Sequence, residues 1–166
     1  MARRGLWGDA AELLRDAPSS ADNDEWLAYL LFQDGGYREA HEIYARLAAG
    51  GVRDDLLLNA GVALALLGSD QRAARQFGAI LETDPGHRLA RLYLANAQLR
   101  LGRADVAAEN YRAYLDVDPS SEPAERVRRI LEQIAPELLP EGLDEPLVPG
   151  PRPAPPPDAE EQETES

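Results

Sequence analysis

The sequence has 166 residues, of which 44% are hydrophobic, and a formal net charge of -13 at pH 7. This hydrophobic content is enough for the core of one ordinary domain, while the absence of cysteine excludes disulfides and cysteine-based zinc or redox sites. All basic residues are arginine, which excludes lysine-based catalysis, and the acidic charge repels phosphate groups, so we expect neither nucleic acid nor an anionic membrane surface as a partner.

The first predicted element is a helix over residues 8–17. Gly5 is followed five residues later by Ala10 and nine residues later by Leu14, a spacing that returns three times along the chain. This spacing predicts the second helix of a repeat whose first helix is missing. We interpret residues 1–20 as a half-repeat or capping helix; the alternative is that the true chain starts upstream. The capping contacts would come from Leu6, Trp7, Leu13 and Leu14.

Three helix pairs are predicted next, over residues 21–53, 54–87 and 88–119. A glycine ends each first helix, an alanine follows five residues later and an aromatic residue nine later. These residues are Gly35, Ala40 and Tyr44, then Gly68, Ala73 and Phe77, then Gly102, Ala107 and Tyr111. The predicted helices cover 22–33 and 37–49, 55–67 and 71–82, and 88–101 and 104–117.

The last two helix pairs end in matching phrases, Glu82-Thr83-Asp84-Pro85 and Asp116-Val117-Asp118-Pro119. Together with the Gly, Ala and aromatic offsets, these phrases resemble the tetratricopeptide repeat. The resemblance implies an all-α fold, a tetratricopeptide-type α-solenoid of antiparallel helix pairs. Its signature residues are packing residues, so it implies a fold and not a particular partner. The first pair departs from it by ending in Gly50-Gly51.

A further helix is predicted over 123–135, inside a C-terminal capping segment of residues 120–135. Its apolar residues form one stripe and its charged residues point elsewhere, so we expect it to cover the last repeat. The stripe consists of Val127, Ile130, Leu131 and Ile134; the charged residues are Arg126, Arg128, Arg129 and Glu132. Residues 136–166 hold nine of the 13 prolines and nine acidic residues, which predicts a disordered Pro-rich acidic tail.

In the family that the repeats resemble, the first helices line a concave groove. Carried over by offset, the resemblance implies a partner-binding groove of Glu25, Trp26, Tyr29, Phe32, Leu58, Asn59, Val62, Leu92, Tyr93, Asn96 and Arg100. Some family members hold a chaperone carboxylate in a clamp of Lys, Asn and Arg side chains. Only Asn59 agrees with that clamp here, and Glu25 stands where a cation is needed. We therefore expect a protein or peptide ligand with hydrophobic anchors, its backbone held by Asn59 and Asn96, although some of these side chains could serve packing alone.

Nothing in the sequence indicates catalysis. His41 and His87 have no acidic residue at metal-ligand spacing, and no phosphate loop or nucleophile motif occurs, so we expect surface histidines, no metal and no cofactor. The leading hypothesis is a cytoplasmic, non-catalytic adaptor or scaffold that is a monomer or weak homo-oligomer. The alternatives are a type III secretion translocator-type chaperone and a self-assembling structural repeat module. The tail, through apolar residues such as Leu147, either competes for the groove or stays in solvent.

Overall fold

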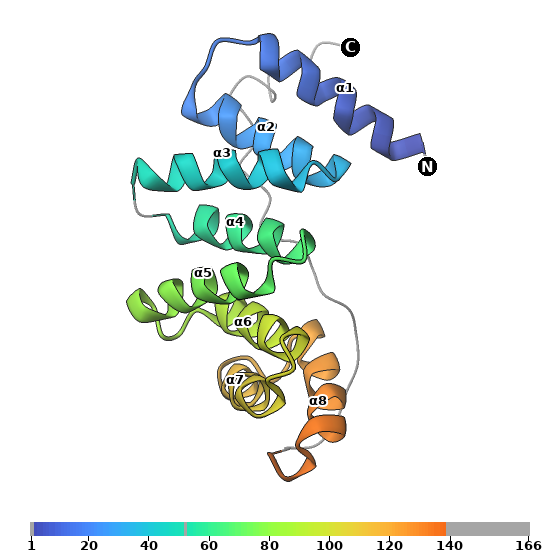
Figure 1. Cartoon of the computed structure of the whole chain (residues 1–166), viewed down its shortest axis with the longest axis vertical. Helices are drawn as coiled ribbons and strands as arrows, with labels where there is room; N and C mark the ends of the chain where they lie inside the picture. Colours follow the sequence, from blue (N-terminus) through green and yellow to red (C-terminus); the bar gives the residue numbers. More distant parts are fainter. Residues whose placement is uncertain (1, 52, 139–166) are drawn as a thin grey trace.

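The computed structural model describes residues 2–51 and 53–138 of the chain. Eight α-helices and one short 3-10 helix make up this part, and it contains no strand (Figure 1). The elements are α1 (Ala2–Asp16), α2 (Ala21–Asp34), α3 (Tyr37–Ala49), α4 (Asp54–Leu66), α5 (Asp70–Thr83), α6 (Arg88–Arg100), α7 (Ala104–Val117), α8 (Glu122–Ile134) and η1 (Pro136–Leu138). The predicted helices from α2 to α8 agree with these bounds within one or two residues. The first three residues of the predicted disordered tail form η1, so the tail was predicted to begin too early; the rest of it, 139–166, lies outside the described residues.

The first helix is longer than predicted, because it begins at Ala2 and not near Gly8. Gly5 was expected to precede the helix, but it lies inside it. Glycine weakens a helix without forbidding it, and Gly8 has a packing role in this one. A Cβ atom on Gly8 would lie 3.3 Å from Oδ2 of Asp34, so the missing side chain lets α1 approach the end of α2 closely.

The three predicted turn glycines have the backbone conformation that their role requires. Gly35, Gly68 and Gly102 have φ angles of 95°, 72° and 73°. This left-handed region is costly for residues that carry a Cβ atom and open to glycine, which is why it ends a first helix without strain. The chain can then reverse into the second helix of each pair.

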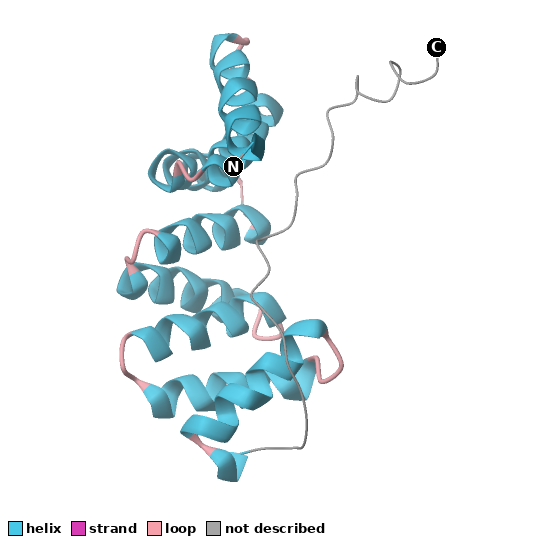
Figure 2. Ribbon diagram, turned by 90° about the vertical axis from the view of Figure 1, so that its right-hand side faces the viewer, coloured by secondary structure: helices cyan, strands magenta, loops and turns pink. Residues whose placement is uncertain are grey.

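The helices stack in chain order as an antiparallel array, and each contacts the next (Figure 1). The view in Figure 2 shows the same succession from the side. The helix α4 also contacts α6, so first helices of neighbouring pairs lie side by side. We call the side of the array formed by α2, α4 and α6 the first-helix face, and the side formed by α3, α5 and α7 the second-helix face.

Small and aromatic side chains alternate in the core, as the offsets predict. Ala40, Ala73 and Ala107 are fully buried, and so are Phe77 and Tyr111. A further small residue, Gly61, was not predicted to matter, yet a Cβ atom there would lie only 2.5 Å from Cε1 of Phe77. In the matching places of the neighbouring first helices stand Ala28 and Ala95, both fully buried.

The helix α8 covers the C-terminal end of the array. Val127 and Leu131 are buried in one cluster with Tyr111 and Tyr114, and Ile130 packs against it. One detail of the prediction is wrong. Arg128 was expected to point away, but it is buried and donates a hydrogen bond to the carbonyl of Pro119 at 2.5 Å. The guanidinium reaches back to the turn that precedes α8 because that carbonyl needs a donor.

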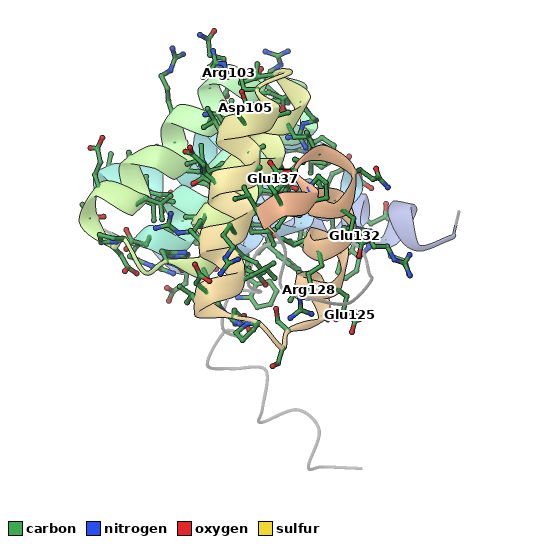
Figure 3. The ribbon with its side chains drawn as sticks, turned by 90° about the horizontal axis from the view of Figure 1, so that it is seen from below. Arg103, Asp105, Glu125, Arg128, Glu132 and Glu137 are labelled. Atoms are coloured by element: carbon green, nitrogen blue, oxygen red, sulfur yellow. The ribbon has the colours of Figure 1, made fainter. Side chains whose placement is uncertain are left out.

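The outer side of this C-terminal end is polar. Figure 3 looks at this end and labels Glu125, Arg128 and Glu132 on α8 and Glu137 in η1. Glu132 and Glu137 are exposed, and Arg112 donates a hydrogen bond to the carbonyl of Leu138 at 2.9 Å. Such a polar end surface is what a terminal element of a repeat array needs.

The N-terminal end is covered only in part. Trp7, Ala11 and Leu14 pack on α2 and α3, as a capping helix should. Leu6 and Leu13, which were also predicted to cap, are 67% and 75% exposed. They lie seven residues apart, on the outer face of α1, because α2 can cover only one side of that helix. No helix among the described residues has the length and apolar character needed to cross a bilayer.

Candidate functional site

The candidate site is the first-helix face, because it gathers most of the predicted groove residues from three helices. Residues three or four positions apart share one side of a helix, and the predicted residues of α2, α4 and α6 follow this spacing. The structure places these residues in two environments. Some are half-buried at the surface, while others are part of the core.

An aromatic cluster forms an accessible apolar part of this face at α2. The rings of Trp26 and Tyr29 meet edge to face, with centroids 5.7 Å apart and planes at 85°. Trp7 from α1 meets the other side of Tyr29 at 6.3 Å and 86°. All three side chains are half-buried. The sequence predicted Trp7 only as a capping residue, because nothing in the repeat offsets indicates that α1 brings it to Tyr29.

The ring of Phe32 continues this apolar surface toward α4. It lies 5.4 Å from the ring of Tyr37 at 69°. It also packs against two core clusters, one that contains Leu31 and Ile43 and one that contains Leu58 and Phe77. The half-buried position of Phe32 agrees with a place at the edge of the face.

Two predicted groove residues are core residues. Leu58 is 1% exposed in a cluster with Phe77 and Ile80, and Leu92 is 3% exposed in the cluster that α8 covers. Their prediction as groove residues is wrong, because a first helix in this array buries one side against its own partner and another against the next pair. Four other predicted residues, Asn59, Val62, Tyr93 and Asn96, are 7% to 8% exposed.

Tyr93 and Asn96 are tied to the second helices. The ring of Tyr93 lies 5.5 Å from the ring of Phe77, and burial raises the pKa of Tyr93 to about 12. The hydroxyl of Tyr111 donates a hydrogen bond of 2.6 Å to Oδ1 of Asn96. Burial also raises the pKa of Tyr111, against the opposing positive charges of Arg100 and Arg126. The side-chain oxygen of Asn96 is therefore already occupied by a hydrogen bond within the core and is not available to a ligand.

The buried amide nitrogen of Asn96 has no hydrogen-bond partner in the described part of the chain. An unpaired buried donor costs free energy, so an acceptor brought to this nitrogen would be favourable.

An arginine that the sequence did not predict pairs with two carboxylates at the acidic rim of the face. Arg53 donates to both carboxylate oxygens of Glu25, at 2.7 and 2.9 Å, and also binds Asp55 at 2.5 Å. Burial acts to raise the pKa of Asp55, but the hydrogen bond and charge of Arg53 outweigh it and hold that pKa below its usual value. A ligand at this rim would meet an ion-paired network and not an isolated carboxylate.

The other predicted charged residue, Arg100, is exposed and binds Asp70 at 2.6 Å. Asp70 begins α5, so this pair links the second and third helix pairs. The first-helix face is therefore apolar at α2 and has ion pairs at its rims.

Both histidines lie half-buried at the surface and have structural partners. Nδ1 of His41 lies 3.1 Å from the carbonyl of Ala60, and Nδ1 of His87 accepts a hydrogen bond from the backbone N–H of Ala90 at the start of α6. Among the described residues, no group of three or more His, Asp or Glu side chains could hold a metal ion.

Among known proteins, solved structures resemble this chain, and they identify its fold. No protein-family model matches the sequence, and no curated protein matches it. The solved structures that resemble it include the type III secretion chaperone SycD of Yersinia enterocolitica in complex with a peptide of the translocator YopD. That match has a TM-score of 0.67 and 20% identity, and it covers 72% of this chain and 96% of the SycD chain.

Two further structures are similar. MamA MSR-1 matches with a TM-score of 0.63 and 19% identity, over 83% of this chain and 84% of its own. The first tetratricopeptide repeat domain of Spaghetti (RPAP3), bound to the HSP90 peptide SRMEEVD, matches with a TM-score of 0.63 and 20% identity, over 69% and 93%. The chain has the tetratricopeptide-repeat fold. The resemblance seen in the sequence is thereby confirmed for the fold, including the antiparallel helix pairs.

Proposed function

We propose that this tetratricopeptide-repeat protein is a cytoplasmic adaptor that binds a partner peptide on its first-helix face and catalyses nothing. One observation carries the proposal: the half-buried rings of Trp26 and Tyr29 stand on α2 beside a rim where Arg53 pairs with Glu25. Aromatic side chains with one face accessible are common anchors for apolar side chains of a ligand. Two similar structures hold peptides, one in SycD and one in Spaghetti, which supports the proposal.

The partner's segment should carry one or two apolar anchors that meet Trp26 and Tyr29. Its backbone should then run toward α4 and α6, where the unpaired amide nitrogen of Asn96 can donate to a carbonyl. Acidic side chains near Glu25 should contribute little, because Arg53 is already shared between two carboxylates.

The experiment is affinity capture from cells followed by titration of the captured partner's segment. The variant Trp26→Ala/Tyr29→Ala should lose binding by about tenfold or more, since interface aromatic residues commonly contribute at least 2 kcal/mol. The matched control is Val106→Ala, which trims an exposed apolar side chain of α7. If the control loses as much as the aromatic variant, the first-helix face is not the binding surface. Tyr93→Ala would be a poor probe, because it opens a cavity beside Phe77.

A second candidate function, self-assembly, is favoured by Leu6 and Leu13. Their exposed positions on the outer side of α1 leave an apolar stripe without a partner helix among the described residues. Light scattering over a range of concentrations tests it: an oligomer that Leu6→Gln/Leu13→Gln dissolves supports assembly, and a monomer at every concentration excludes it. A secretion-chaperone role rests on likeness in fold to SycD alone and would require a secreted protein as the captured partner.

A further inference from the structure

The second-helix face contains a shallow hollow that lies apart from the proposed peptide-binding surface. It lies between α3, α4 and α5 and measures about 360 Å³. Its lining combines hydrogen-bond donors with a small apolar floor. The residues are His41, Ala45, Leu64, Arg72, Arg75, Gln76 and Ala79.

The two arginines of the hollow have no ion pair with a described residue. Six other arginines each hold a carboxylate, namely Arg15, Arg46, Arg53, Arg88, Arg100 and Arg112. No Asp or Glu lines the hollow. In a chain with a net charge of -13, two neighbouring cations therefore stand in this hollow without a lining carboxylate.

The repeat itself does not require these cations. Arg72 and Arg75 lie four and seven residues after Gly68. At the same offsets after Gly35 and Gly102 stand Glu39 and Glu42, and Val106 and Glu109. A packing role would call for similar side chains in each pair. The positive charges at these two positions of the second pair are therefore not required for packing of the repeat.

His41 stands beside Arg72 in the hollow. Because the carbonyl of Ala60 can only accept a hydrogen bond, the contact with Nδ1 at 3.1 Å places a proton on that nitrogen. Nε2 is then left for the hollow, and the nearest guanidinium nitrogen of Arg72 lies 3.5 Å from it. That distance is at the limit of a hydrogen bond, so Arg72 can turn to a better acceptor at little cost.

We propose that this hollow binds one phosphate-type oxyanion, with Arg72 and Arg75 as its main donors. Guanidinium groups recognise such oxyanions by paired, charge-assisted hydrogen bonds. The amide of Gln76 completes the donor set. The floor of Ala45, Leu64 and Ala79 leaves room for a carbon group attached to the oxyanion, so the site takes a phosphate ester as well as the free ion.

Nearby carboxylates do not fill the hollow. Glu39 and Glu42 line the adjacent hollow together with Arg38 and Leu67, and Glu39 binds Arg15 at 2.7 Å. The Glu42 carboxylate opposes an anion through its charge alone. Its replacement by Gln should therefore strengthen binding, whereas loss of either arginine should weaken it.

The test is NMR titration of the full chain with inorganic phosphate and with phenyl phosphate, against sodium chloride at equal ionic strength. Saturable shifts are expected in the His41 ring signals and in the Nε–H signals of Arg72 and Arg75. Arg72→Gln and Arg75→Gln should each weaken binding by about tenfold, the loss of one charged hydrogen bond. Arg38→Gln, an exposed cation of the adjacent hollow, should change it less than twofold.

The outcomes separate cleanly. Tighter binding of phenyl phosphate than of phosphate indicates an esterified ligand that uses the apolar floor, and equal binding indicates the free oxyanion. Shifts that do not saturate, or that persist unchanged in Arg72→Gln/Arg75→Gln, overturn the proposal. Both arginines are exposed, so the variants should fold, and an unchanged melting curve confirms it. None of these results depends on the first-helix face.

Discussion

Gly61 of α4 and Phe77 of α5 set the distance between their two helices: a Cβ atom on the glycine would lie 2.5 Å from the ring. The ring is fully buried. It cannot move away without displacing neighbours, because core side chains are close-packed.

Gly61→Ala should therefore destabilise the protein although alanine is the better helix former. Overpacking of this kind costs about 1 to 3 kcal/mol. Gly78→Ala is the matched control, since it also lies inside a helix but its Cβ atom would meet nothing within 4 Å. The control should gain about 0.5 to 1 kcal/mol from helix propensity. Thermal or urea unfolding measures both, and equal effects of the two substitutions would remove the steric explanation.

The buried alanines of the second helices should resist enlargement. Ala73→Leu and Ala107→Leu add methylene groups at positions with no exposed surface, so each should cost about 1 to 3 kcal/mol. Ala45→Leu, at an exposed position of α3, should change stability by less than about 0.5 kcal/mol. Urea unfolding of the three variants checks this, and a harmless Ala107→Leu would show that the α6 and α7 contact can relax.

Removal of α8 should expose the core of the third helix pair. Val127 and Leu131 alone contribute roughly 1.5 to 3 kcal/mol each when buried, against a domain stability of roughly 5 to 15 kcal/mol. A chain that ends at Pro119 should aggregate or melt much lower. Leu131→Asp should reproduce the defect in the full chain and Glu132→Ala should not. A truncated monomer with unchanged melting would contradict the capping role.

Alkaline pH should unfold the protein through its buried tyrosines. Burial raises the pKa of Tyr93 from 10.0 to about 12, so this side chain stays neutral in the folded state where it would ionise in the unfolded chain. The stabilising contribution is complete below pH 10 and is lost as pH rises toward 12. Burial shifts the pKa of Tyr44 and Tyr111 in the same direction. Tyr93→Phe should keep more of its stability between pH 10 and 12, which urea unfolding at several pH values measures.

The tail beyond Leu138 is predicted to compete with a partner for the first-helix face. Its 28 residues could span roughly 87 Å if each extended by about 3.1 Å. A short tether supplies an effective concentration on the order of 1 mM. A chain ending at Leu138, which keeps the Arg112 hydrogen bond, should therefore bind the partner more tightly than the full chain. Equal affinities would mean that the tail stays in solvent.

The local structure could be predicted from single residues and their spacing. Each turn glycine requires a left-handed backbone, and each Asp-Pro phrase stops a helix, so the helix bounds follow from backbone geometry alone. The fold followed as well, because the spacing repeats. At the N-terminal end this reasoning was weaker: the helix was predicted to begin after Gly5, whereas Gly5 lies within α1.

The site depended on contacts between residues far apart in the chain, and the sequence alone could not supply them. The repeat offsets place Leu58 and Asn59 side by side on one helix, but only the neighbouring helices decide that Leu58 is enclosed by Phe77. Trp7 meets Tyr29, and Arg53 meets Glu25 across 28 residues, because helix stacking brings their ends together. Helix periodicity determines which side of its own helix a residue occupies; the angle and distance between helices determine what that side meets, and they arise from the packing of all the helices together.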